Sequence, residues 1–272
     1  MMTVQSMWKA CATFLLLHVA ALAQAPVIDP NDASARLKEV SQRVQGLVGV
    51  KGPERMAALE RAATDYLQIA SDFASDADVV AKAAWEAGEC WRRASKIEEA
   101  ADAYAKVLAT EDSRFRQRAL FERASMLRRL KQLEEAGKLY EQAGAIDPES
   151  VRAHDARLWV ARVLDLRGEK ALAVEAYRSA AAAAVGPRRV IEADDALAKA
   201  LIKSGDLDGA RTVLEHAEAA VTPDIEGGGE DGERIRKALD EMGARGMLRR
   251  ALDKRGTPAK DAADVESARG GK

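Results

Sequence analysis

The sequence predicts an all-α fold in which antiparallel helix pairs stack in one direction. Three observations support this prediction: a pattern that recurs four times at nearly constant spacing, a composition rich in alanine with only 4% aromatic residues, and no sustained alternation of apolar and polar residues. Strands favour β-branched and aromatic side chains and alternate in polarity, so this chain is poorly suited to a sheet.

The recurring pattern is an alanine, then a large apolar residue four positions later, then a small or medium apolar residue three positions after that. The alanines lie 36, 37 and 37 residues apart. Offsets of four and seven place all three residues on one helical face. The alanines are Ala100, Ala136, Ala173 and Ala210, the large residues are Tyr104, Tyr140, Tyr177 and Leu214, and the last set is Val107, Ala143, Ala180 and Ala217.

A second helix is expected before each of these, because a further small residue lies twelve positions before each alanine. A larger apolar residue follows it by three positions, and short polar segments such as RRASK and RLKQ come between the two helices. The helices of a pair can therefore approach closely where small residues face each other. The small residues are Gly88, Ala124, Ala161 and Ala198, and the larger ones are Trp91, Leu127, Leu164 and Leu201.

This pattern resembles the tetratricopeptide repeat (TPR), whose unit of about 34 residues carries small, aromatic and Pro positions in this order. Pro148, Pro187 and Pro223 follow the second helices, and Asp147 is expected to cap the helix that Pro148 begins. The resemblance covers 81–224 and implies a right-handed α-solenoid of four TPR-like repeats, each two or three residues longer than the family's unit. A weaker likeness is to bacterial envelope TPR proteins of the outer-membrane assembly and cell-division coordinator type.

The segments on either side are expected to extend this array. Residues 33–80 contain a degenerate helix pair, in which Ala62 and Tyr66 lie 38 positions before Ala100 and Tyr104. Residues 225–232 (with the run EGGGEDG) are expected to form a Gly-rich loop, 233–255 a capping helix, and 256–272, which have almost no apolar content, a disordered tail. The alternative for 233–255 is a basic partner-binding helix that uses Arg245, Arg249, Arg250 and Lys254.

Residues 1–23 resemble a bacterial secretory signal peptide, and 24–32 are expected to be a flexible N-terminus. Lys9 precedes the thirteen-residue apolar run CATFLLLHVAALA, which ends on Ala21, Leu22 and Ala23. The run is shorter than the roughly 20 residues of a membrane span. We therefore predict cleavage after Ala23 and an exported protein, periplasmic or secreted, without a membrane span. An uncleaved N-terminal helix is the alternative.

The sequence shows no catalytic, cofactor or metal site. His154 and His216 each stand alone, and no Cys or His residues have metal-ligand spacing. Cys90, the one cysteine after the signal segment, is expected to be a buried small hydrophobe. Glutamate pairs at 98–99 and 134–135 begin second helices, where they complement the helix dipole. We expect no enzyme activity and no cofactor. The net charge of −2 gives no reason to expect nucleic-acid binding.

One feature predicts a binding surface. In TPR arrays the first helices line a concave groove, so the resemblance implies that a second stripe on each first helix faces a ligand. The stripe carries cations and two aromatic residues in the first two repeats, and it is mixed or acidic in the last two. The candidate groove residues are Lys82, Trp85, Arg92, Arg118, Phe121, Arg128 and Arg162.

We predict that these residues bind a protein or peptide segment with acidic and apolar residues. The alternative is that Trp85 and Phe121 only pack between repeats and that the arginines are solvated. The Lys and Asn pattern with which similar domains hold a C-terminal carboxylate is not reproduced. The predicted function is therefore an exported interaction scaffold, with two alternatives: a structural subunit of an envelope complex that uses its convex face, and an envelope enzyme acting on cell-wall polymer.

Overall fold

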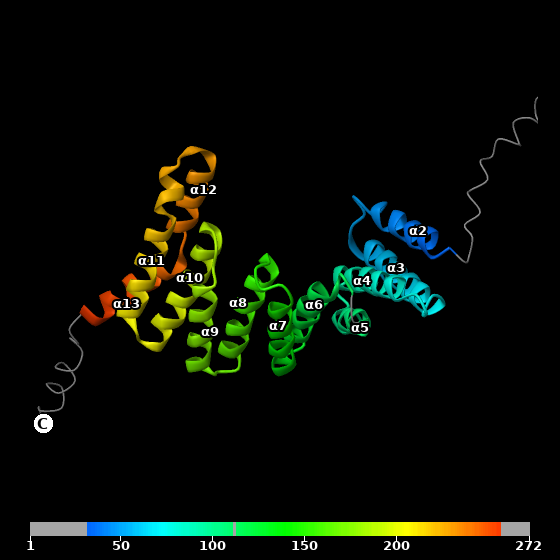
Figure 1. Cartoon of the computed structure of the whole chain (residues 1–272), viewed down its shortest axis with the longest axis horizontal. Helices are drawn as coiled ribbons and strands as arrows, with labels where there is room; N and C mark the ends of the chain where they lie inside the picture. The colour runs from blue at the N-terminus through cyan, green and yellow to red at the C-terminus, as the bar shows by residue number, and fades with distance from the viewer. Residues whose placement is uncertain (1–31, 111–112, 257–272) are drawn as a thin grey trace, which may run out of the picture.

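The computed structural model describes residues 32–110 and 113–256, which form helices joined by short turns and include no strand (Figure 1). The all-α prediction is confirmed. The signal segment, residues 24–31 and residues 257–272 lie outside the described residues. The first helices of the pairs are α2 (Ala33–Gln45), α4 (Ala77–Arg93), α6 (Arg116–Arg129), α8 (Val151–Leu166) and α10 (Pro187–Ser204). The second helices are α3 (Gly52–Asp72), α5 (Ile97–Leu108), α7 (Leu133–Ile146), α9 (Lys170–Ala182) and α11 (Leu207–Glu226). Two further helices follow the last pair, α12 (Gly229–Asp240) and α13 (Gly243–Gly256).

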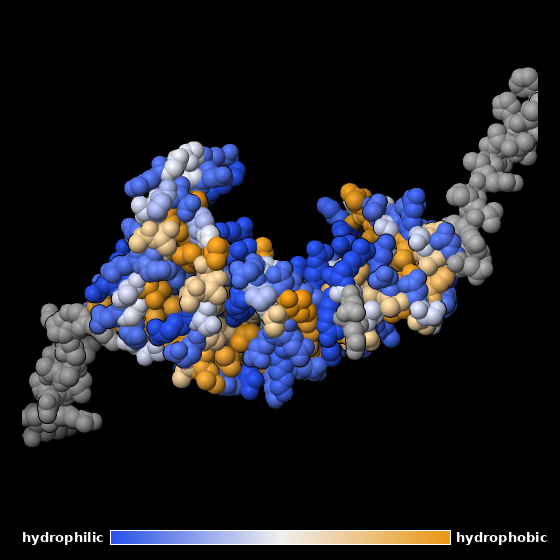
Figure 2. All heavy atoms as spheres, viewed as in Figure 1, coloured by the Kyte–Doolittle hydropathy of each residue, from blue (hydrophilic) through white to orange (hydrophobic). Residues whose placement is uncertain are grey.

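The helices form a curved array in which neighbours along the chain pack side by side. Figure 1 shows α2 near one end and α12 near the other, and both project toward the same side of the array. Figure 2 shows that side hollowed between them. The curvature therefore gives the solenoid a concave face and a convex face.

Small residues meet inside each pair, as the repeat pattern predicts. The small residues of the first helices and the alanines of the second helices are all buried. At Gly88 the approach leaves no room for a side chain, because an added Cβ would lie 2.6 Å from the Cε1 atom of Tyr104. The tyrosines at the repeat position are buried beside these contacts: Tyr104, Tyr140 and Tyr177.

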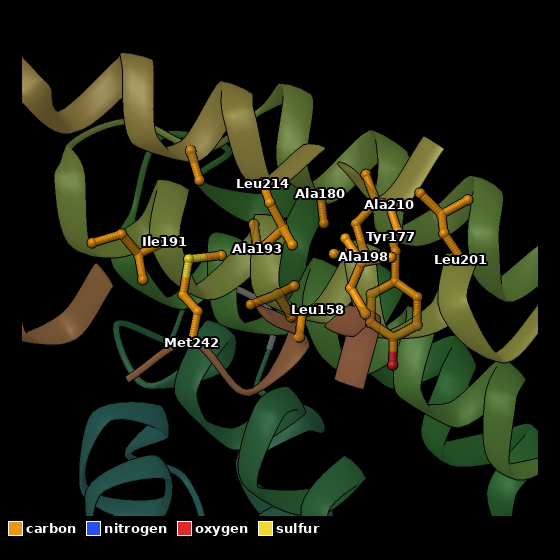
Figure 3. Close-up of a cluster of buried hydrophobic side chains, with 14 of the residues drawn as sticks. Leu158, Tyr177, Ala180, Ile191, Ala193, Ala198, Leu201, Ala210, Leu214 and Met242 are labelled. Carbon is orange, nitrogen blue, oxygen red and sulfur yellow. The ribbon is translucent and has the colours of Figure 1, made fainter. Parts of the chain in front are cut away.

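The apolar core continues along the whole array. One cluster joins α2–α5, a second joins α4–α8, and a third joins α8–α13. Figure 3 shows the third cluster, in which Leu158 of α8, Ile191 of α10 and Leu214 of α11 lie with Met242, which precedes α13. The residues after α11 thus cover core that the last repeat would leave exposed.

The four turns within the repeats share one backbone conformation. The residue five positions before each repeat alanine has a positive φ: 62° at Ser95, 66° at Lys131, 81° at Gly168 and 91° at Gly205. In each turn the next residue's N–H donates to a carbonyl five positions earlier, at 2.9–3.0 Å, as from Lys96 to Trp91. This bond closes the end of each first helix in the manner of a Schellman motif.

The N-terminal pair follows the degenerate repeat. Leu37 and Val40 of α2 are buried with Tyr66 of α3 in the first cluster. Two ion pairs also link the helices, Arg36 with Asp72 at 2.6 Å and Arg43 with Asp65 at 2.7 Å.

The C-terminal segment differs from the expectation in two ways. The Gly-rich segment 225–232 is almost wholly helical, because α11 continues to Glu226 and α12 begins at Gly229. The glycines instead form a tight helix–helix turn, since a Cβ on Gly232 would lie 2.9 Å from the Ile225 carbonyl oxygen. The expected single helix over 233–255 is two helices, broken between Asp240 and Gly243.

Two expectations about prolines and caps were also wrong. Pro223 lies inside α11 and does not begin a new helix. Ser150, not Asp147, caps α8, and its side chain accepts a hydrogen bond from the Ala153 N–H at 3.1 Å. Pro187 does occupy the first turn of α10, where its missing N–H costs no helical bond.

Candidate functional site

First helices of neighbouring repeats contact each other through side chains of the second stripe or next to it. Arg128 of α6 contacts Trp159 of α8, and Arg162 of α8 pairs with Glu192 of α10 at 3.3 Å. Asp165 of α8 also reaches Lys203 of α10, at 3.1 Å. Figure 2 shows mainly hydrophilic residues lining the hollow between the two ends of the array.

Trp85 and Phe121 pack against the tyrosines of the repeats. Trp85 lies 5.4 Å from Tyr104 and is stacked with Phe115 at 5.7 Å between ring centres. Phe121 lies edge-on to Tyr140 at 5.3 Å. Both side chains are partly buried. Each therefore contributes to packing between helices and keeps only part of its surface at the concave face.

Arg92 is held within its own helix. Its guanidinium donates two hydrogen bonds to Glu89, at 3.2 and 2.8 Å, and the Tyr104 hydroxyl donates to the same carboxylate at 2.7 Å. Burial alone would raise the pKa of Glu89, but the hydrogen bonds from Arg92 and Tyr104 outweigh it and lower that pKa. The positive charge predicted at Arg92 is thus largely neutralised.

Arg128 and Arg162 converge on one indole ring. The guanidinium carbons lie 4.2 Å (Arg128) and 4.8 Å (Arg162) from the centre of the Trp159 ring, within the range of cation–π attraction. Tyr140 is stacked with Trp159 at 5.9 Å. The structure therefore brings two of the predicted groove residues together around an aromatic residue that the prediction did not include.

Lys82, in the second turn of α4, and Arg118, in the first turn of α6, are exposed and lie nearer the helix N-termini than Arg92 and Arg128. Lys82 lines a polar cleft of about 440 Å³ between α2 and α4, together with Lys38, Gln42 and Glu86. An adjoining hollow of about 370 Å³ continues from Lys82 to Arg114. The N-terminal end of the concave face is thus open and polar.

At the C-terminal end of the face, the charged side chains already have partners within the chain. A hollow of about 210 Å³ between α8 and α10 is lined by three cations and three carboxylates, which form two ion pairs between the helices and one within α10. Asp195, which shares the repeat position of Trp85 and Phe121, pairs with Lys199 and accepts a hydrogen bond from the Ala244 N–H of α13 at 2.9 Å. At this end the stripe therefore caps and anchors α13.

The repeat pattern does not predict Trp159 as a site residue, because Trp159 lies one position after the repeat register. The register points to Leu158, which is completely buried in the core. The signal available in the sequence was the spacing of Trp159 and Arg162, which puts the two side chains on the same side of a helix.

No group of three or more His, Cys, Asp and Glu side chains within residues 32–110 and 113–256 is placed to hold a metal ion. Over the same residues, no helix combines the length and apolar character needed to cross a membrane.

The chain matches no protein-family model and no curated protein. Its fold is similar to solved structures of TPR proteins. A MamA protein has a TM-score of 0.54 at 14% identity, over 71% of this chain and 96% of that one. YrrB, described as a TPR protein with an unusual peptide-binding site, has a TM-score of 0.50 at 19% identity, over 71% and 88%. A MamA fragment from Desulfovibrio magneticus RS-1 has a TM-score of 0.51 at 17% identity, over 68% and 94%.

These similarities define the class of fold. The chain has the all-α solenoid fold of these TPR proteins, as the repeat spacing predicts.

Proposed function

We propose that this chain is an exported scaffold that binds a protein or peptide segment along its concave face. The observation that carries the proposal is the contact of Arg128, Trp159 and Arg162 between the first helices α6 and α8, in an array with one hollowed, mainly hydrophilic side (Figure 2). YrrB, of similar fold, is described as having a peptide-binding site. The groove is preformed, so binding would require little ordering of the scaffold.

The proposal assigns binding, not catalysis, to this face. The carboxylates that meet there serve mainly as ion-pair partners: Glu89 for Arg92, Glu192 for Arg162, and Asp165 for Lys203. The partner expected for the face is a segment with acidic and apolar residues, because the central cations and aromatic rings are of the types that dominate interface energetics.

Export belongs to the same proposal, and it is supported by the apolar run that ends on Ala21, Leu22 and Ala23. N-terminal sequencing of the protein recovered outside the cytoplasm should begin at Gln24. A cytoplasmic protein that begins at Met1 would contradict this part of the proposal.

The binding function is tested by cross-linking and capture from the cell envelope, with mass spectrometry to identify the partner. Trp85→Ala and Phe121→Ala should each weaken partner binding by about 2 kcal/mol or more if these residues are hot spots. Their packing against Tyr104 and Tyr140 also predicts a lower melting temperature, so stability and affinity must be measured on the same variants. Lost stability with unchanged affinity in the folded fraction would show that the aromatic residues serve packing alone.

A second candidate function uses the opposite face. A hollow of about 320 Å³ opens between the second helices α7 and α9 and is lined largely by small or apolar residues, including Gly144, Ala145, Val160 and Ala176. Such a hollow suits a structural subunit that docks through its convex side. Ala176→Glu would block this contact and leave the concave face unchanged, so loss of the captured partner in this variant alone would favour the second function.

A further inference from the structure

Arg128 differs from three other cations of the first helices. Arg92, Arg162 and Lys203 each lie within ion-pair distance of a carboxylate. In the part of the chain that the structure describes, no carboxylate lies that close to Arg128. Its Nε atom is buried and has no hydrogen-bond partner.

The surroundings hold Arg128 in place without neutralising it. Its guanidinium lies over Trp159 at 4.2 Å and interacts with the hydroxyl of Tyr140, which also shares a 2.9 Å hydrogen bond with Ser125 Oγ. Stacking on an indole favours a cation but supplies no counter-charge. Arg128 is therefore a positioned, partly desolvated guanidinium that still has donors for an anion.

The carboxylate of Glu192 lies beside the cluster formed by Arg128, Trp159 and Arg162. Glu192 of α10 reaches Arg162 through one contact of 3.3 Å, and both side chains remain a third or more exposed. A single long contact between exposed groups is easily exchanged. Arg162 thus already binds a carboxylate, that of Glu192. Glu192 pairs with only one of the two guanidinium groups beside Trp159.

We propose that Arg128, Trp159 and Arg162 form the recognition site for a carboxylate of the bound segment. The incoming carboxylate would bind Arg128 and displace Glu192 from Arg162. Planar guanidinium groups match carboxylates through paired N–H donors, so the two arginines can specify an acidic residue as well as attract it. This inference rests on the proposed function, and it places the acidic contact between α6 and α8, away from Lys82 and Arg92.

The site predicts opposite effects of two charge-removing variants. Arg128→Gln removes the unpaired cation and should weaken binding of an acidic peptide at least about tenfold. Glu192→Gln removes the internal competitor and should strengthen binding several-fold, because Arg162 then has no carboxylate to exchange. Lys106→Gln, which removes an exposed cation of the second helix α5, is the matched control and should leave the affinity within about twofold.

The test uses the full chain and three peptides of known composition. The first is an acetylated and amidated nine-residue peptide that alternates Asp and Leu, the second has Asn in place of every Asp, and the third is the Asn peptide with a free C-terminal carboxylate. Binding is followed by the indole N–H signal of Trp159 in two-dimensional NMR spectra, assigned with Trp159→Phe. The Asp peptide should shift this signal saturably, and the Asn peptide should not. A shift by the third peptide would show that a chain terminus also supplies the carboxylate, and no shift would restrict the source to Asp or Glu side chains.

The inference is overturned if the Asp peptide leaves the Trp159 signal in place, if the Asn peptide shifts it equally, or if Arg128→Gln binds like the unchanged protein. Arg162→Gln provides a second loss of charge should Arg128→Gln unfold, as judged by circular dichroism. Failure of the scaffold function would appear differently, as partner capture that no concave-face variant changes. A captured partner whose binding depends on Trp85 but not on Arg128 would preserve the scaffold function and reject this site.

Discussion

Helices α4 and α5 approach closely at Gly88, and this contact makes glycine specific to its repeat. The equivalent positions in the other repeats are alanines, whereas a Cβ on Gly88 would lie 2.6 Å from the buried Tyr104 ring. Gly88→Ala should destabilise the protein by about 1–3 kcal/mol, because the ring or helix α5 must move. Chemical denaturation measures the change.

The matched control is Gly144→Ala on α7, where the nearest atoms to an added Cβ lie 3.8 Å away. This variant should be neutral or more stable by up to about 1 kcal/mol, since alanine is the better helix former. Equal losses in the two variants would contradict the close-approach explanation.

A second residue-scale consequence concerns His154, which is 3% exposed and has no hydrogen-bond partner at either ring nitrogen. Burial lowers the pKa of His154 below its ordinary value of 6.5. Below pH 6.5 the unfolded chain therefore binds this proton more readily than the folded chain does. The free energy of unfolding should fall as the pH drops through 6.5 toward the lowered pKa.

His154→Leu should remove this loss, and unfolding measured between pH 7 and pH 5 checks it. His216, the other histidine of the described residues, bonds the buried Asp194 at 2.7 Å, so both chains should carry His216→Gln. A pH dependence that is unchanged by His154→Leu would show that other groups cause it.

At the scale of the element, the four intra-repeat turns need a left-handed residue, and only two of them have glycine. Ser95 and Lys131 adopt φ of 62° and 66°, a region that costs residues with a Cβ roughly 1–2 kcal/mol. Ser95→Gly and Lys131→Gly should each raise the unfolding free energy by about 0.5–1 kcal/mol, after the greater freedom of glycine in the unfolded chain is subtracted. Thermal and chemical denaturation measure this gain, and Gly168→Ala should produce a loss of similar size.

The sequence predicts the pairing of the helices better than it predicts where they end. Ala100, Tyr104 and their equivalents fix helix pairing because burial of small and aromatic residues at fixed spacing has one solution, close antiparallel packing. End signals are weaker, because a single proline or glycine is compatible with more than one local structure. Pro223 therefore lies within α11, where Thr222 Oγ1 donates to the Glu218 carbonyl at 2.7 Å, and the glycines near 228 form a tight turn in place of a loop.

The candidate site was only partly predictable for a related reason. Periodicity identifies the face on which Arg128 and Arg162 lie, but not the partners that side chains choose across helices. Arg92 is neutralised by Glu89 within one turn, and Trp159 reaches the face from a position next to the repeat register. The contact between Arg128 and Trp159 depends on the distance between α6 and α8, which no pattern within one helix contains.

At the scale of the whole molecule, the two ends of the concave face differ in how open they are to a ligand. The N-terminal end is an open polar cleft between α2 and α4, whereas the C-terminal end is closed by ion pairs and by the bond from Ala244 to Asp195. A solenoid must cover the core of its last repeat. The basic residues of α13 support that role, since Arg245 pairs with Glu218 of α11 at 3.1 Å.

The cap assignment predicts a local effect on stability. Leu248 of α13 is 8% exposed and belongs to the cluster that joins α8–α13. Because each repeat in a solenoid contacts only its neighbours, Leu248→Ala should lower protection from hydrogen exchange mainly in α10 and α11, by about 2–3 kcal/mol, and should leave α3–α5 unchanged. Arg249→Ala, an exposed change on the same helix, is the control and should alter neither region. Hydrogen exchange read by mass spectrometry distinguishes the outcomes: an equal loss along the whole chain would mean that the array unfolds as one cooperative unit, and no loss in α10 would mean that α13 does not stabilise the last repeat.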